Sequence, residues 1–214
     1  AGCVQNNNMS MKYILYTLVG GAVGTNCYIL TGEDGGAIVF DIPDGCGGKI
    51  ADFCAKHQIV PLAVFLTHGH FDHCGGVAEF LRHFGVKVYG NANDAPLAAV
   101  AAANRYGVKA ENCEITDFVG DGQTVNVGGF SVEVLFTPGH TKGSVCYFIE
   151  DMMFSGDTLF HGDIGRTDFP ESDSLAMEIS LKKLSAIEKN YFVYPGHEES
   201  TTLDAEKREN PYLK

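Results

Sequence analysis

The chain has 214 residues, with 15 Lys and Arg against 27 Asp and Glu, which gives a formal net charge of −12 at pH 7. Hydrophobic residues make up 45% and charged residues 20%, so the composition excludes a disordered or collagen-like protein. The acidic balance argues against nucleic acid and anionic membrane partners, which select Lys- and Arg-rich surfaces.

Short apolar, β-branched and aromatic runs alternate with Gly-rich turns, which is the pattern of strands. In chain order, strands are predicted at residues 14–19, 26–30, 37–40, 63–66, 86–89, 124–127, 130–136, 144–149, 152–155 and 191–194. Helices are predicted at residues 49–57, 76–84, 95–104 and 174–187. The last helix is expected to bury one apolar face, formed by Leu175, Ile179, Leu181, Leu184 and Ile187.

The cysteines and the chain ends bear on compartment and organisation. The seven cysteines are an odd number without a C-x-x-C pair, which predicts free thiols in a reducing, cytoplasmic compartment. No apolar run approaches the ~18 residues of a membrane span. Residues 1–10 lack the features of a signal peptide and are expected to be a flexible tail or an expression remnant. Residues 11–214 are expected to form one domain, because no Pro- or Ser-rich linker divides them.

Three predicted strands end in a Gly-His pair. The segments are A-V-F-L-T-H-G-H at 63–70, V-L-F-T-P-G-H at 134–140 and F-V-Y-P-G-H at 192–197. A histidine just past a strand end lies on a loop held by a rigid sheet, where binding residues concentrate. We expect His70, His140 and His197 to converge on one place.

The strongest chemical signal is T-H-G-H-F-D-H at 67–73. His68, His70, Asp72 and His73 bring four nitrogen and oxygen donors into six residues. Burying an ionised carboxylate among several imidazoles without a cation would be costly, so the cluster predicts a metal site rather than a polar surface turn.

Further donors follow other predicted strands. His140 and His197 end two of them, and Asp157 lies in F-S-G-D-T-L-F after a third. A carboxylate has two oxygens and can bridge two cations. Catalytic zinc takes about three protein ligands, so seven donors predict two divalent metals, ~4 Å apart, that share a hydroxide. The predicted ligands are His68, His70, Asp72, His73, His140, Asp157 and His197.

This ordered donor set resembles the metallo-β-lactamase superfamily. The segments T-P-G-H-T-K-G-S, G-R-T-D-F-P, V-Y-P-G-H, N-P-Y-L and N-C-Y are similar to those of its short glyoxalase II-like branch, also called hydroxyacylglutathione hydrolase-like. The resemblance implies an αββα sandwich of two facing mixed sheets flanked by helices. It also implies a first metal on His68, His70 and His140, a second on Asp72, His73 and His197, and a bridging Asp157.

The resemblance further implies a hydrolase that cleaves an acyl thioester, such as a hydroxyacyl-glutathione, with Asp72 and Asp157 as its catalytic carboxylates. Zinc is the expected metal, and iron and manganese suit the same donors. Arg166 in G-R-T-D-F-P is expected to bind a substrate carboxylate, with an ion pair to Asp163 or Asp168 as the alternative. Asp41, which follows a strand, is expected to support the ligands rather than to bind metal.

Other functions stay open on the same residues. Glu199 stands where the full-length enzymes have tyrosine, and the chain stops at Lys214 without their glutathione-binding helical segment, which leaves the thiol open. A persulfide dioxygenase with one iron is the main alternative, because two histidines and one carboxylate form the usual iron oxygenase site. A lactonase, a β-lactamase, a ribonuclease Z-type nuclease and a non-enzymatic binding protein are the others.

Overall fold

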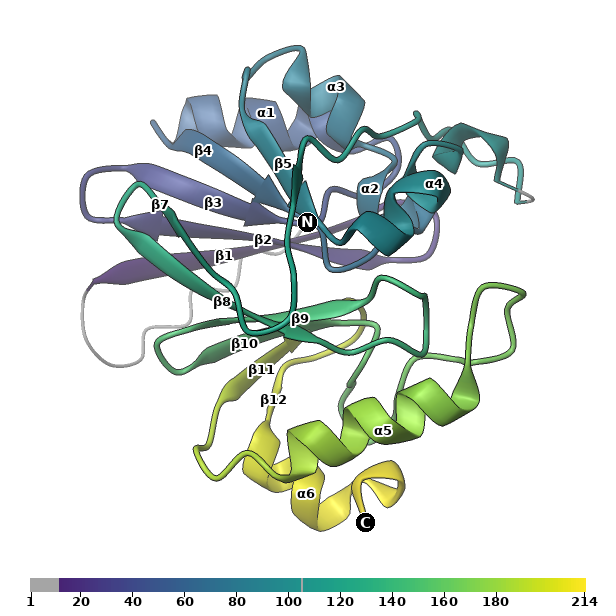
Figure 1. Ribbon diagram of the computed structural model, residues 1–214. Coiled ribbons are helices and arrows are strands. Elements are labelled where there is room, and N and C mark those ends of the chain that lie inside the picture. The colour runs from purple at the N-terminus through teal and green to yellow at the C-terminus, as the bar shows by residue number, and fades with distance from the viewer. Residues whose placement is uncertain (1–11, 105) are drawn as a thin grey trace.

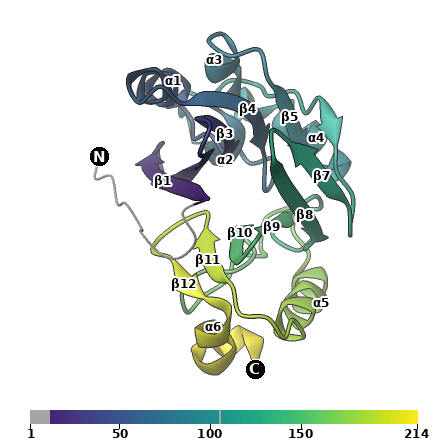
Figure 2. The ribbon, with the colours of Figure 1, turned by 90° about the vertical axis from the view of Figure 1, so that its left-hand side faces the viewer.

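The computed structural model describes residues 12–104 and 106–214, and the expected tail at residues 1–10 lies outside them. The described chain forms two six-stranded sheets that face each other, with helices on the outer side of each (Figures 1 and 2). This is the αββα sandwich that the resemblance implies. The six cysteines among the described residues are free and buried. Every helix in this part of the chain is too short or too polar to span a bilayer.

The first half of the chain supplies the first sheet. Its strands, in chain and spatial order, are β1 Tyr13–Gly20, β2 Thr25–Gly32, β3 Gly36–Phe40, β4 Val60–Phe65, β5 Lys87–Gly90 and β6 Asp117–Phe118. β1, β2 and β3 pair antiparallel, and β3 to β6 pair parallel. The helices of this half are α1 Gly47–Lys56, α2 Phe71–Cys74, α3 Val77–Leu81 and α4 Ala95–Ala98, with 3₁₀ turns at Ala92–Asp94 and Ala101–Ala103.

The second half supplies the second sheet. Its strands, in the spatial order β12-β11-β10-β9-β8-β7, are β7 Thr124–Val127, β8 Phe130–Phe136, β9 Val145–Ile149, β10 Met152–Gly156, β11 Phe192–Pro195 and β12 Thr201–Thr202. Only the β10–β11 pair is parallel among these described strands. The helices are α5 Ser174–Ser185 and α6 Leu203–Glu209, followed by a 3₁₀ turn at Pro211–Leu213.

The strand period of two explains why the core has three layers. In β2, Cys27 and Ile29 face the helices of the first half, whereas Tyr28 and Leu30 face the opposite sheet. A third apolar cluster fills the space between the second sheet and α5 and α6. Strands that are buried on both faces need near-continuous apolar sequences, and these apolar runs are the signal from which the strands were predicted.

The apolar face predicted for the last helix is wrong in part. Leu175 and Ile179 are 66% and 53% exposed, and Met177 and Ser180 are buried in their place. Gly139 sets this rotation, since a Cβ there would lie 2.5 Å from the Met177 Cα atom. The Ser180 hydroxyl also donates a hydrogen bond to the Pro138 carbonyl at 2.7 Å. This close backbone contact outweighs the apolar periodicity of the sequence.

Other helix boundaries also differ from those predicted. The helix predicted at 95–104 is broken into α4 and a 3₁₀ turn, and the one at 76–84 is shortened to Val77–Leu81. α2, α6 and the two-residue strands β6 and β12 were not predicted.

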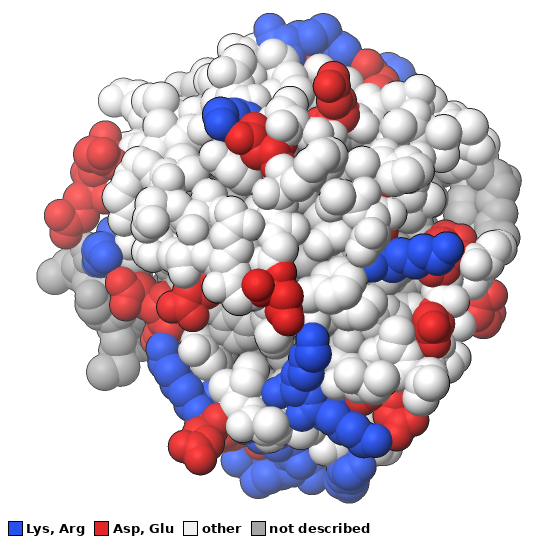
Figure 3. Space-filling view, in the orientation of Figure 1, with Lys and Arg blue, Asp and Glu red and all other residues white. Residues whose placement is uncertain are grey.

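Basic residues of α5 and α6 gather at the lower edge of the face shown in Figure 3. The rest of that face carries scattered charges of both signs.

Two leucines of α5 test its observed orientation. Leu184 is fully buried, so Leu184→Ala should lower the free energy of unfolding by about 2–5 kcal/mol. Leu175→Ala on the exposed face should change it by less than about 0.5 kcal/mol. Denaturant unfolding of both variants measures this, and equal losses would contradict the orientation.

Candidate metal centre

The seven predicted ligands lie together at one edge of the two sheets. His68 and His70 lie on the loop after β4, Asp72 and His73 on α2, and His140 on the β8–β9 loop, whereas Asp157 and His197 follow β10 and β11. They form three overlapping groups, in each of which one ligand atom per residue lies within 4.8 Å of the others. The groups are His68–His70–His140, His68–His73–Asp157 and Asp72–His73–His197.

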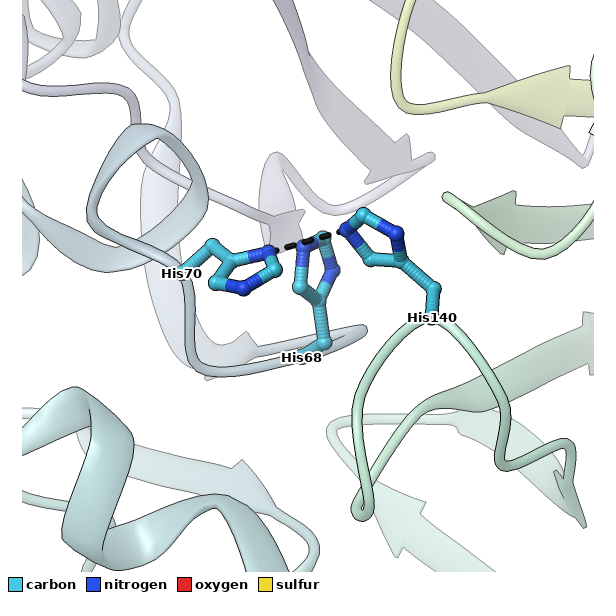
Figure 4. A group of neighbouring side chains, drawn as sticks. All are labelled: His68, His70 and His140. Carbon is cyan, nitrogen blue, oxygen red and sulfur yellow. Dashed lines mark hydrogen bonds between the residues drawn. The ribbon is translucent and has the colours of Figure 1, made fainter. Parts of the chain in front are cut away.

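The first group, His68, His70 and His140, joins two separate loops (Figure 4). His140 Nδ1 lies 2.8 Å from the Arg166 carbonyl, and His70 Nε2 lies 2.8 Å from Glu171 Oε1. Because a carbonyl and a carboxylate only accept, these nitrogens are donors. In neutral rings the opposite nitrogens, His70 Nδ1 and His140 Nε2, then carry lone pairs, and they lie only 2.9 Å apart. A shared cation removes the repulsion between them.

His68 completes this group with a nitrogen that no protein donor or acceptor satisfies. Its Nδ1 lies 3.1 Å from the Thr67 hydroxyl, while Nε2 is buried without a hydrogen-bond partner. Burial lowers the pKa of His68 well below its usual value, and burial also lowers that of His140. Unprotonated imidazoles with inward-facing nitrogens are the form that binds a divalent metal.

The second group, Asp72, His73 and His197, is organised around Asp41. His73 is fully buried, and its Nδ1 lies 2.8 Å from Asp41 Oδ2. Asp41 also accepts hydrogen bonds from the Thr67 amide at 2.8 Å and from the Thr67 hydroxyl at 2.7 Å. A histidine whose other nitrogen donates to a carboxylate is held in the tautomer and orientation for metal binding. Asp41 therefore holds a predicted ligand in place, which is the role that the resemblance implies for it.

Asp157 lies between the two groups. Its Oδ1 is 3.2 Å from His73 Nε2, and its Oδ2 is 3.4 Å from both His140 Nε2 and His197 Nε2. The buried Oδ1 makes no hydrogen bond of good geometry, and His73 Nε2 is the polar atom beside it. The arrangement fits a carboxylate that bridges two cations, and the donor chemistry as a whole fits divalent metals.

Without metal, the two groups differ in the protons that they hold. Burial opposes charge on His73, but Asp157, Asp72 and Asp41 outweigh it and raise the pKa of His73 well above its usual value. Burial of His197 is likewise outweighed, mainly by hydrogen bonds to Asp157 and Asp72, which raises the pKa of His197 to about 9. Burial would raise the pKa values of the two carboxyl groups, but His73 and His197 lower them well below the usual range.

Arg166 forms the ion pair that was the alternative to binding a substrate carboxylate. Its Nε and Nη2 atoms donate to the carboxylate of Asp168 at 2.6 and 2.7 Å, and its guanidinium lies 4.3 Å from the centre of the Phe169 ring. The ion pair is with Asp168 and not with Asp163. The side chain is exposed and also lines the cavity in front of the metal ligands. Its carbonyl, as noted, orients His140.

The cavity beside the seven donors has a volume of about 940 Å³. His70, Asp72, His140, Asp157 and His197 form its floor. Its walls are largely apolar and come from both halves of the chain. The apolar wall residues include Val23, Phe71, Leu97, Val100, Ala101, Tyr106, Phe160, Ile164 and Phe169.

Sequence reasoning identified Asp41 but missed other partners that orient the predicted ligands. Glu171 follows G-R-T-D-F-P, and its spacing from His70 carries no signal. Asn26 of the N-C-Y segment donates from Nδ2 to the carbonyls of Pro195 and Glu198, which flank His197. The N-C-Y segment therefore contains a residue, Asn26, that holds the His197 loop, and only the fold shows this contact.

The chain belongs to the metallo-β-lactamase superfamily, whose family model matches residues 20–197. It is 36% identical over 202 residues to a probable metallo-hydrolase, YqgX, of Bacillus subtilis, covering 90% of this chain and 94% of that protein. It is 33% identical over 196 residues to the hydroxyacylglutathione hydrolase GloC of Haemophilus influenzae, covering 88% of this chain and 92% of that protein.

Two solved structures are also similar. One is the BLEG-1 B3 metallo-β-lactamase, with a TM-score of 0.85 and 32% identity over 93% of this chain and 99% of that one. The other is TTHA1623 in a di-iron-bound form, with a TM-score of 0.81 and 34% identity over 92% and 99% of the two chains. The two structures share the fold but carry different names, and one of them was solved with two iron ions bound.

The proton difference between the two groups can be measured. His197, with a pKa of about 9, holds a proton at pH 7, so metal binding to the second group must release it. His68 and His140, whose pKa values are lowered, release none. In zinc titrations of the metal-free protein, we expect one of the two calorimetric steps to release protons at pH 7. The part of that release that comes from His197 should shrink as the pH approaches 10, because His197 is then already neutral. His73, whose pKa is also raised, contributes to the same step.

Repeating the titration in two buffers of different ionisation heat gives the number of protons released in each step. The other step is the internal control. Equal release in both steps would contradict the assignment of protons.

Proposed function

We propose that this member of the superfamily is a dinuclear metal-dependent thioester hydrolase that acts on hydroxyacyl-glutathione-type substrates. The observation that carries the proposal is Asp157, an incompletely satisfied buried carboxylate between two groups of ligands at the floor of a cavity. The similarity to a hydroxyacylglutathione hydrolase over nearly the full length of both chains supports the reaction class.

His68, His70 and His140 would hold one cation, Asp72, His73 and His197 the other, and Asp157 would contact both. When bound, the cations supply Lewis-acid polarisation of the acyl carbonyl and a nucleophile from water at neutral pH. Zinc is the metal that we propose, because histidine and carboxylate donors suit it. Metal analysis of the purified protein would show whether the site holds iron or manganese instead.

The chain's own residues orient the ligands and the substrate. The Arg166 carbonyl, Glu171 and Asp41 each fix one ligand ring, so no reorganisation is needed when the reaction occurs. The apolar walls exclude water from the acyl group and strengthen electrostatic interactions at the floor. No protein nucleophile is required.

Arg166 is suited to bind a substrate carboxylate. Its present partner Asp168 is exposed, and an exposed ion pair contributes only about 0.2–1 kcal/mol, so a substrate carboxylate can replace it at little cost. The planar guanidinium is already held by Phe169 in an orientation that suits two parallel hydrogen bonds.

Metal analysis beside a thioester assay tests the function. We expect two metal ions per chain and hydrolysis of S-lactoylglutathione. Asp157→Asn keeps the shape but removes the charge between the cations, so it should lose at least one metal and orders of magnitude in kcat. One bound iron together with oxygen uptake on glutathione persulfide would instead establish the dioxygenase alternative. Two metals without thioesterase activity would redirect the search to lactones or β-lactams.

The role of Arg166 is tested by comparing an anionic with a neutral thioester. Arg166→Ala should weaken binding of the anionic substrate by about 1.5–3 kcal/mol, or about ten- to hundred-fold in KM, with a small change in kcat. Arg166→Lys should recover part of the loss, because an ammonium cannot form the bidentate contact. Lys142→Ala, which removes an exposed lysine beside the His140 loop and outside the cavity lining, is the matched control. Equal losses for both substrates would assign Arg166 to the scaffold.

A further inference from the structure

Asp94 is a buried carboxylate outside the seven-donor cluster, and it contacts both loops of the first group. It is 2% exposed. Its Oδ2 accepts hydrogen bonds from the Gly69 amide at 2.8 Å and from the Thr141 hydroxyl at 2.6 Å, and its Oδ1 accepts one from the Gly143 amide at 2.7 Å. Gly69 lies between His68 and His70, and Thr141 follows His140. One carboxylate thus joins the loops that carry all three histidines.

Two glycines make this contact sterically feasible. A Cβ on Gly69 would lie 2.7 Å from the Asp94 carbonyl oxygen, and a Cβ on Gly143 would lie 2.6 Å from Asp94 Cγ. Real Cβ atoms do not approach other atoms so closely. The glycines of T-H-G-H and T-K-G-S are therefore required by Asp94 and not only by the turns in which they lie.

Asp94 does not make the helix-capping hydrogen bonds that its position before α4 would favour. It precedes α4, where an aspartate commonly accepts hydrogen bonds from the first amides of its own helix. Its side chain makes no such capping contact and reaches across to the two loops instead. A residue that breaks a local rule without a local gain is expected to serve a distant site.

We propose that Asp94 is a positioning residue for the first metal. It holds the His68–His70 loop against the His140 loop at the separation where their ring nitrogens can share one cation. In neutral rings whose outer nitrogens donate, the lone pairs of His70 Nδ1 and His140 Nε2, 2.9 Å apart, would push the loops apart. The three hydrogen bonds to Asp94 oppose that separation, so less free energy is spent on bringing the ligands together when metal binds.

Glu206 offers a matched control. It is also 2% exposed. It accepts hydrogen bonds from the Gly162 backbone amide at 2.8 Å, the Thr201 hydroxyl at 2.7 Å and the Asn210 side-chain amide at 2.9 Å. None of these partners lies within two residues of a predicted ligand. Asp94→Asn and Glu206→Gln therefore remove the same chemistry from two buried carboxylates, only one of which holds histidine loops.

The experiment is a Co²⁺ titration of metal-free protein, followed by visible absorption and by competition with a chelator. We expect Asp94→Asn to weaken one of the two binding steps by about ten- to hundred-fold, the usual effect of removing a group that orients ligands. The other step should change by less than threefold. Glu206→Gln should lower thermal stability comparably while both affinities stay within threefold of wild type.

Equal weakening of both steps, or wild-type affinities in Asp94→Asn with only a loss of stability, would overturn the proposal. If Asp94→Asn does not fold, Thr141→Val removes a single donor to Asp94 and should weaken the same step, and Thr141→Ser should restore it. Wild-type affinity in Thr141→Val would then contradict the proposal. The inference rests on the metal centre of the proposed function but not on its substrate, because the readout is cation binding.

Discussion

The crowding of unshared electron pairs at one edge of the two sheets is the constraint on which this structure depends. His70 Nδ1 faces His140 Nε2 at 2.9 Å, His68 Nε2 is buried without a partner, and the buried Asp157 Oδ1 has only the imidazole of His73 beside it. Divalent cations can satisfy all of these atoms. The outward-facing ring nitrogens donate to the Arg166 carbonyl, Glu171 and Asp41. These hydrogen bonds keep the lone pairs of the opposite nitrogens directed inward, where cations can bind them.

The two sheets must be held together closely at that edge, and hydrogen bonds between the halves do this on both sides of the ligands. On one side, Asn26 of β2 holds the loop that carries His197. On the other side, Asp94 holds the loop after His140. Between them, the Tyr147 hydroxyl of β9 donates to the Leu66 carbonyl at the end of β4. The apolar core brings the sheets face to face, and these hydrogen bonds fix the position of one sheet relative to the other at the site.

Most strands could be predicted because both of their faces are buried, which forces continuous apolar runs such as those of β3 and β9. The convergence of the seven donors could be predicted because dense His and Asp donors have few other uses in a buried segment. The rotation of α5 could not, since it depends on the backbone contact between Gly139 and Met177. Asp94 could not either, because its partners lie 25 to 49 residues away along the chain. Contacts between distant loops leave no local pattern.

The fold by itself does not select a substrate, and the similar proteins carry different names. Selection falls to the cavity walls, most of which lie on segments that carry none of the seven donors. Leu97 and Val100 come from the region after Asp94, and Phe160 and Phe169 from the two ends of the loop that includes Arg166. On the proposed function, the apolar walls would favour an acyl chain without charge near the metals, and Arg166, once released from Asp168, would offer one place for a carboxylate at the rim. Asp94 connects these two functions, because it anchors the start of one wall to the loops that hold the metal ligands. A substitution in that wall can therefore alter metal affinity as well as substrate preference.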